Sequence, residues 1–259
     1  MVASYRNIAL GDNRKPVAAW LGLRDVKAWR SIITTPLTTP NKLSFLPVIL
    51  VGGALFSIDS AVEPTLKNQI YPWYNSSFSL STVVGDRLIG MAPLLLFAAG
   101  GDNEPVLLKT GLALGDAALT AVILAQVSKQ LTGRSRPSNG PDAWDWGHIN
   151  TNNVGPYTSF PSLHATTYSA AATVIGKMLD CELPANLFFL ALFTGDMAGH
   201  KHWVSDMVLG AWFGRAIGEY WLRYYQMHPV DKDAWLLCPY VNPATGGNFE
   251  FAFTIARHF

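Results

Sequence analysis

Two histidines in this sequence stand beside residues that could turn an imidazole into a catalytic group. His202 is followed four positions later by Asp206, at the start of a segment with a helical pattern. At that spacing a carboxylate can accept a hydrogen bond from one ring nitrogen, which fixes the tautomer and leaves the other nitrogen free as a nucleophile. The same spacing also occurs in ordinary pairs on a helix surface. Covalent catalysis at His202 therefore depends on what surrounds it.

The second histidine, His164, lies at the start of an earlier apolar segment. Pro161 and Ser162 come just before it, which predicts that Ser162 caps a helix beginning at Leu163. The backbone N–H groups at a helix N-terminus form an anion site, and His164 would lie in the first turn beside it. As an alternative, Ser162 is only a helix cap and His164 an ordinary polar residue of that turn.

Three cations gather at the end of a further apolar segment, at Lys129, Arg134 and Arg136. Basic residues are common in the last turn of a helix, where they complement its dipole. In a chain otherwise poor in charge, however, the cluster favours a phosphate site, for which Arg and Lys are well suited. His200 lies close to His202, but no third and fourth ligand follow at a familiar spacing, so neither a metal nor another cofactor is predicted.

Together these residues form three motifs whose order and spacing resemble the signatures of the type 2 phosphatidic acid phosphatase and vanadium haloperoxidase superfamily. The first runs from Lys129 to Arg136 and its following proline, the second covers residues 161–164, and the third runs from His202 to Asp206. The likeness covers roughly residues 85–225. It implies an α-helical bundle that acts as a metal-independent phosphohydrolase.

The resemblance also implies a role for each residue. His202 would attack phosphorus to form a phosphohistidine, Asp206 would orient it, and His164 would protonate the leaving oxygen. The phosphoryl oxygens would be held by cations and backbone N–H groups, those of Lys129, Arg136, Ser162 and Leu163. Such preorganised donors stabilise the charge that develops in phosphoryl transfer.

Two positions depart from the family's pattern. The second motif usually has glycine where this chain has Leu163, whose side chain must then point away from phosphate. The third motif usually has arginine six residues before its histidine, where this chain has Asp196. Losing a charge-assisted phosphate contact would weaken transition-state binding by an amount on the order of a few kcal/mol. Arg134, His200 and Lys201 are the candidates to compensate.

These departures leave more than one function open. We expect a phosphatase that acts on a phosphomonoester or diphosphate, in particular of a lipid. A weakened or inactive membrane protein of the same fold could instead bind an anionic headgroup, and Asp196 favours that alternative. A vanadate-dependent haloperoxidase is a third alternative, but the chain is short for that branch and the missing cation would weaken vanadate binding.

The composition favours contact with a membrane. Of the 259 residues 49% are hydrophobic and only 14% are charged, against about 25% charged in an average soluble domain. The formal net charge is +1, so no excess of charge indicates a nucleic-acid partner. Although no run of about 18 uncharged apolar residues stands out, we expect an integral or tightly associated membrane protein, in the cell envelope if the source is bacterial.

Six apolar segments have the length and pattern of helices, and we predict an all-α fold with a core bundle of about six helices. They are Leu43–Ile58, Leu88–Ala99, Val106–Ser128, Leu163–Leu179, Ala185–Ala198 and Met207–Leu222. In the last segment Gly210, Gly214 and Gly218 repeat every four residues. That spacing puts them on one helix face, which allows a neighbouring helix to approach closely.

We predict three regions along the chain. Residues 1–42 form an arm whose segment Pro16–Ile33 is an amphipathic helix, lying on a membrane surface or packed on the body. Residues 43–225 form the helical domain, and residues 226–259 a tail. In the tail, hydrophobic residues alternate from Phe249 to Ile255, which predicts a strand paired with Trp235–Val241. The two cysteines, Cys181 and Cys238, allow one disulfide, but two free thiols fit the sequence at least as well.

Overall fold

Six α-helices and a two-stranded sheet make up the part of the chain that this computed structural model describes, residues 45–70, 78–100, 105–149, 155–198, 200–228, 230, 235–243 and 249–257. The helices are α3 (Phe45–Thr65), α5 (Phe78–Ala99), α6 (Pro105–Thr132), α7 (Leu163–Met178), α8 (Glu182–Ala198) and α9 (Val204–Met227). A π-helical turn, Leu66–Ile70, follows α3, and a short 3₁₀ turn, Pro137–Asn139, follows α6. The predicted all-α bundle is confirmed.

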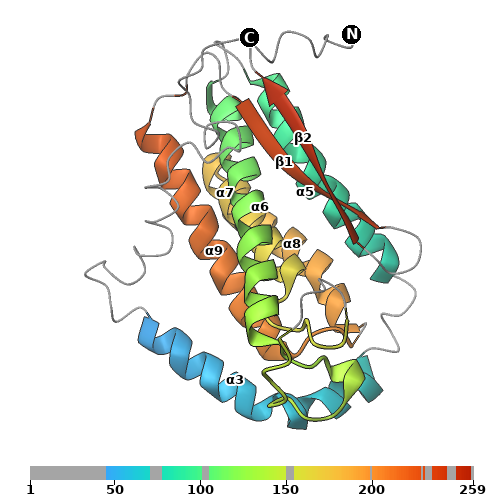
Figure 1. Cartoon of the computed structure of the whole chain (residues 1–259). Coiled ribbons are helices and arrows are strands. Elements are labelled where there is room, and N and C mark those ends of the chain that lie inside the picture. Colours follow the sequence, from blue (N-terminus) through green and yellow to red (C-terminus); the bar gives the residue numbers. More distant parts are fainter. Residues whose placement is uncertain are drawn as a thin grey trace.

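Helices α5 to α9 form the bundle, with α6 at its centre, and α3 crosses the end at which α6 stops and α9 begins (Figure 1). The apolar core is built mainly from small and aliphatic residues of α6 and α7 together with aromatic residues of α9. The predicted amphipathic helix over residues 16–33 lies outside the described residues. The helix predicted to begin at Leu88 begins ten residues earlier, at Phe78.

The tail forms the predicted pair of strands, β1 (Trp235–Pro243) and β2 (Phe249–Arg257), which run antiparallel from the pair Trp235–Arg257 to the pair Pro243–Phe249. β1 packs against α5 and α6, and the hairpin lies along that side of the bundle (Figure 1). Cys238 of β1 is buried there and Cys181 is partly exposed, and both are free thiols. Burial raises the pKa of the Cys238 thiol to about 12.

One helical stretch of the described chain, Pro105–Asn139, is long and apolar enough to cross a membrane, and 78% of its apolar window is buried inside the protein. The buried core helix of a soluble protein has the same length and apolar composition. One charged residue within this stretch, the buried Asp116, accepts a hydrogen bond from the Tyr225 hydroxyl of α9.

The close packing of α7 on α9 depends on the row of glycines in α9. A Cβ at Gly214 would lie 2.1 Å from the Thr166 carbonyl oxygen, and one at Gly218 would lie 2.7 Å from the Ala170 carbonyl oxygen. At Gly210 the corresponding distance, to the Ser162 carbonyl oxygen, is 3.0 Å. The predicted helix face is confirmed, and it brings the backbones of the two helices into contact.

Candidate active site

Three chain segments meet where α6 ends and where α7 and α9 begin. The Ser162 N–H donates to the Asp206 carbonyl at 3.2 Å, which joins the start of α7 to the first turn of α9. The Ser159 N–H donates to the Arg134 carbonyl at 3.1 Å, which joins the segment before α7 to the chain that leaves α6. The three sequence motifs therefore lie at one end of the bundle.

The turn after α6 is made by Gly133, whose φ of +52° lies in the left-handed region. Its N–H donates to the Lys129 carbonyl at 3.0 Å, which is the hydrogen bond expected where a residue in the left-handed (αL) conformation caps the C-terminus of an α-helix. A Cβ at this position would lie 2.3 Å from the carbonyl carbon of His148, so a side chain does not fit. The glycine thereby directs Arg134 and Arg136 back toward the helix ends.

His202 is buried, with 4% of its surface exposed, and its Nδ1 lies 2.7 Å from the Ser159 carbonyl oxygen. A carbonyl oxygen can only accept, so Nδ1 carries the proton and the lone pair of the neutral ring is on Nε2. That is the tautomer that a nucleophilic imidazole needs. Ser159 was missed in the sequence, because no local pattern marks a backbone carbonyl as a partner.

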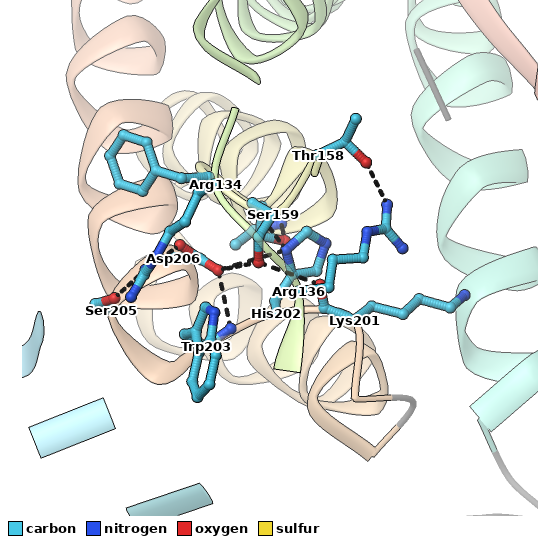
Figure 2. Close-up of polar contacts among 12 residues, drawn as sticks. Arg134, Arg136, Thr158, Ser159, Lys201, His202, Trp203, Ser205 and Asp206 are labelled. Atoms are coloured by element: carbon cyan, nitrogen blue, oxygen red, sulfur yellow. Dashed lines mark hydrogen bonds and ion pairs between the residues drawn. The ribbon is translucent and has the colours of Figure 1, made fainter. Parts of the chain in front are cut away.

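Asp206 acts on His202 in a different way from the one predicted. Its Oδ2 lies 3.9 Å from His202 Nδ1, too far for a hydrogen bond. The same oxygen accepts from the Ser159 hydroxyl at 2.5 Å and from the Trp203 N–H at 2.9 Å. The predicted direct hydrogen bond is therefore corrected: Asp206 holds Ser159, and the Ser159 carbonyl holds His202 (Figure 2).

Burial raises the pKa of the Asp206 carboxyl above its ordinary value. The Arg134 guanidinium opposes this rise, as do the hydrogen bonds from the Ser159 hydroxyl and the Trp203 N–H. The pKa of this carboxyl thus depends on how well these donors are placed.

The predicted role of Arg134 as a phosphate ligand is the second correction, because its guanidinium binds groups of the protein. Its Nη1 donates to Asp206 at 2.5 Å and to the Ser205 hydroxyl at 2.7 Å. Its Nη2 donates to Asp59 at 2.8 Å, and Nη2 and Nε both donate to the Ala143 carbonyl. The guanidinium is fully buried, and it lies over three aromatic rings, those of Phe56, Trp146 and Trp203. The N–H groups of Arg134 that were predicted to bind phosphate therefore donate to acceptors within the protein.

Lys129 and Arg136 are the two remaining predicted cations. Lys129 is buried in the last turn of α6, and Arg136 Nη2 donates to the Thr158 hydroxyl at 2.9 Å. Figure 2 shows Arg136 and Lys201 extending on the same side of His202. Lys201 and Arg136 therefore both place positive charge on that side of His202.

The start of α7 combines a confirmed cap with a further correction. The Ser162 hydroxyl accepts from the Ala165 N–H at 3.3 Å, which confirms the predicted helix cap. The Ser162 N–H, predicted to hold phosphate, is instead bonded to the Asp206 carbonyl at 3.2 Å. The N–H of Leu163 as a phosphate donor stays a prediction.

His164 faces a carboxylate that was missed in the sequence. Its Nε2 lies 3.4 Å from Asp86 Oδ1 of α5, and the same oxygen accepts from the Tyr168 hydroxyl at 3.0 Å. His164 and Asp86 border a pocket of about 20 Å³ that is also lined by Leu163 and Thr167, which is room for about one water molecule. Asp86 interrupts an apolar segment, and that charge was the only local signal for it.

Helix α3 contributes two carboxylates to this end of the bundle. Asp59 is 1% exposed and contacts Arg134, while Glu63 lies 2.7 Å from His200 Nδ1. Asp196 belongs to the last turns of α8, but its side chain lies outside the described residues. Within the described part of the chain, no group of three or more His, Cys, Asp or Glu side chains could hold a metal ion.

Comparisons with known proteins agree with this arrangement. The model of the PAP2 superfamily matches residues 110–229. The chain is similar to the decaprenylphosphoryl-5-phosphoribose phosphatase of Mycobacterium tuberculosis, at 30% identity over 52% of this chain and 71% of that protein. It is similar to the enzyme of the same name from Mycolicibacterium smegmatis, at 34% identity over 44% of this chain and 60% of that protein. No solved structure matches. The chain belongs to the PAP2 superfamily and is a phosphatase, a hydrolase acting on phosphoric esters.

Proposed function

We propose that this protein hydrolyses the phosphomonoester or diphosphate of a lipid, without a metal, through a phosphohistidine on His202. The observation that carries the proposal is the buried imidazole whose Nδ1 proton is held by the Ser159 carbonyl at 2.7 Å. That hydrogen bond orients the ring and puts the lone pair on Nε2, as nucleophilic attack on phosphorus requires.

The reaction would proceed in two displacements. His202 Nε2 forms a bond to phosphorus while the bond from phosphorus to the leaving oxygen breaks, and His164 gives that oxygen a proton. A water molecule then attacks the phosphohistidine and passes a proton to His164, which releases inorganic phosphate and restores both histidines. Lys129, Arg136 and the Leu163 N–H would hold the phosphoryl oxygens, and Lys201 would supply the charge missing at Asp196.

A lipid substrate is supported by the relatives and by the surface of the bundle. The relatives are named for a phosphatase of a decaprenyl-linked phosphoribose. On the outer faces of two helices, large apolar side chains recur every three to four residues and are exposed: Ile123, Val127 and Leu131 of α6 and Leu183, Leu187 and Leu190 of α8. Such stripes suit contact with lipid, so we place the protein at a membrane.

The test is release of inorganic phosphate by the purified protein in detergent micelles, with EDTA present. A polyprenyl monophosphate, a polyprenyl diphosphate and a short water-soluble phosphate ester would be compared. We expect turnover in EDTA and a higher kcat/KM for a lipid substrate. No release from any of the three would contradict the phosphatase proposal, and equal kcat/KM values would contradict the lipid preference.

Asp86→Asn is expected to lower kcat about 10-fold on an alkyl phosphate, because the carboxylate 3.4 Å from His164 stabilises the protonated imidazole that serves as general acid. The loss should be smaller on p-nitrophenyl phosphate, whose leaving group needs little protonation. Asp180→Asn, in an exposed turn, is the matched control. An equal loss on both substrates would show that Asp86 does not act through His164.

A further inference from the structure

We propose that Asp59 of α3 is a positioning residue for His202. With Arg134 and Asp206, whose carboxyl oxygens also receive hydrogen bonds only from donors, it forms a buried cluster. With both carboxyls ionised the cluster has a net charge of about −1, which stabilises the positive charge gained by His202 as it attacks phosphorus. This inference rests on the phosphohistidine mechanism proposed above. It adds to that mechanism a helix that lies before the residues matched by the family model, 110–229.

In each of its hydrogen bonds the Asp59 carboxyl is the acceptor. Its Oδ1 accepts from the Ser205 N–H at 3.1 Å. Its Oδ2 accepts from the Ser205 hydroxyl at 2.5 Å and from Arg134 Nη2 at 2.8 Å. A carboxylate that receives only donors is suited to the ionised form. With 1% of its surface exposed, its charge is little screened by water.

The charge balance explains why a second carboxylate matters. Arg134 lies between Asp59 and Asp206, at 2.8 Å from one and 2.5 Å from the other. With Asp206 alone, the guanidinium would cancel the carboxylate, and His202 at 3.9 Å from Asp206 would face a neutral pair. Asp59 restores one negative charge, and in a buried site that charge acts strongly on a nearby imidazolium.

A continuous series of hydrogen bonds connects Asp59 to the nucleophile. Asp59 accepts from Arg134, Arg134 donates to Asp206, and Asp206 accepts from the Ser159 hydroxyl. The Ser159 carbonyl then accepts from His202 Nδ1 at 2.7 Å. Every residue of this series is buried, so the orientation of the imidazole is fixed by supports on four different segments.

Stability alone does not account for the cluster. Replacing a buried ion pair or triad with apolar residues of similar volume is often neutral or stabilising, because three charges must be taken out of water. Among the side chains that the structure describes, Arg136 and Lys201, which carry the opposite sign, extend on one side of His202 (Figure 2). His200 is held by Glu63 at 2.7 Å. On the Nδ1 side of His202, the described structure places Asp206 at 3.9 Å, and Asp59 is connected to Asp206 through Arg134.

The first variant is Asp59→Asn, which preserves shape and removes the charge. We expect kcat to fall about 10- to 100-fold with little change in KM, since the lost interaction acts on the transition state. Removing negative charge makes the protonated imidazole less stable, so the acid limb of the pH profile of kcat/KM should move to lower pH by about one unit. Glu63→Gln, on the same helix but outside the cluster, should leave that limb in place.

The second variant separates charge from structure. Asp59→Asn combined with Arg134→Gln leaves Asp206 as the one carboxylate and restores a net charge of about −1. We expect the acid limb to return toward its wild-type position, even if kcat stays low. Two results would overturn the proposal. One is a folded Asp59→Asn protein whose pH profile of kcat/KM keeps the wild-type acid limb, and the other is a double variant whose acid limb stays at the position found for Asp59→Asn.

A readout without turnover keeps this inference distinct from the proposed function. The six histidines can be labelled with ¹⁵N and titrated by NMR, with His202→Asn assigning the His202 signal. If Asp59→Asn moves the titration of His202 to lower pH, the electrostatic coupling stands even for a protein that releases no phosphate. If phosphate is released but the His202 titration is unchanged, the inference fails and the phosphatase stands.

Discussion

His202→Ala is expected to lower phosphate release on the order of 10⁴-fold or more. The variant lacks the side chain that forms the covalent intermediate, and the residues that position His202 cannot take over that role. The variant should remain folded, since a buried polar ring is exchanged for a small side chain and the Ser159 carbonyl can accept from water. The measurement is phosphate release from a lipid phosphate under saturating conditions. A parallel alkaline quench should show the phosphoryl group on His202 of the wild-type protein and no such adduct in the variant.

The matched control for this experiment is His228→Ala. His228 is exposed at the far end of α9, where its Nδ1 lies 2.8 Å from the Tyr224 carbonyl and its ring stacks on Tyr224. Its replacement should leave turnover within about twofold of the wild type, as surface changes away from a site usually do. Measurable turnover by His202→Ala, with the phosphoryl group on another residue, would refute the assignment of the nucleophile.

Gly214→Ala should strongly lower the stability of the folded protein, because the new Cβ would lie 2.1 Å from the Thr166 carbonyl oxygen. Backbone atoms cannot rotate away, so α7 and α9 would have to separate. Overpacking of this kind costs about 1–3 kcal/mol, and more where the backbone must shift. We expect a lower thermal midpoint in micelles and a loss of activity, because the same two helices carry His164 and Asp206.

Gly53→Ala provides the comparison within a helix. Gly53 is exposed in α3 and a Cβ there would meet nothing within 4 Å. Alanine is favoured over glycine in a helix by about 1 kcal/mol, so this variant should melt at the same or a higher temperature. If Gly214→Ala melted like Gly53→Ala, the contact between the α7 and α9 backbones would not be as close as described.

The features that could be predicted from the sequence have local causes. Ser162 before an apolar helix is a capping signal, and glycines four residues apart mark one helix face. The spacing of the three motifs located the three helix ends. By contrast, the start of α5 was placed too late, since Gly85 and Asp86 interrupt its apolar pattern although the protein buries or half-buries them.

The partners within the site could not be predicted because they are distant in sequence. Asp59 meets Arg134 across 75 positions, and Asp86 meets Tyr168 across 82. The i, i+4 spacing of His202 and Asp206 misled for a different reason. α9 begins only at Val204, so His202 lies before the helix and the geometry of helical neighbours does not apply to it.

The crossing of α3 has a consequence for how sequences of this kind are compared. All three motifs lie between Lys129 and Asp206, so a protein that begins at α5 would score as complete in a motif search. Such a protein would nonetheless lack two of the groups that contact the Arg134 guanidinium, the Asp59 carboxylate and the Phe56 ring. In this protein, then, a full set of motifs and a complete active site are separate properties, and helix α3 distinguishes them.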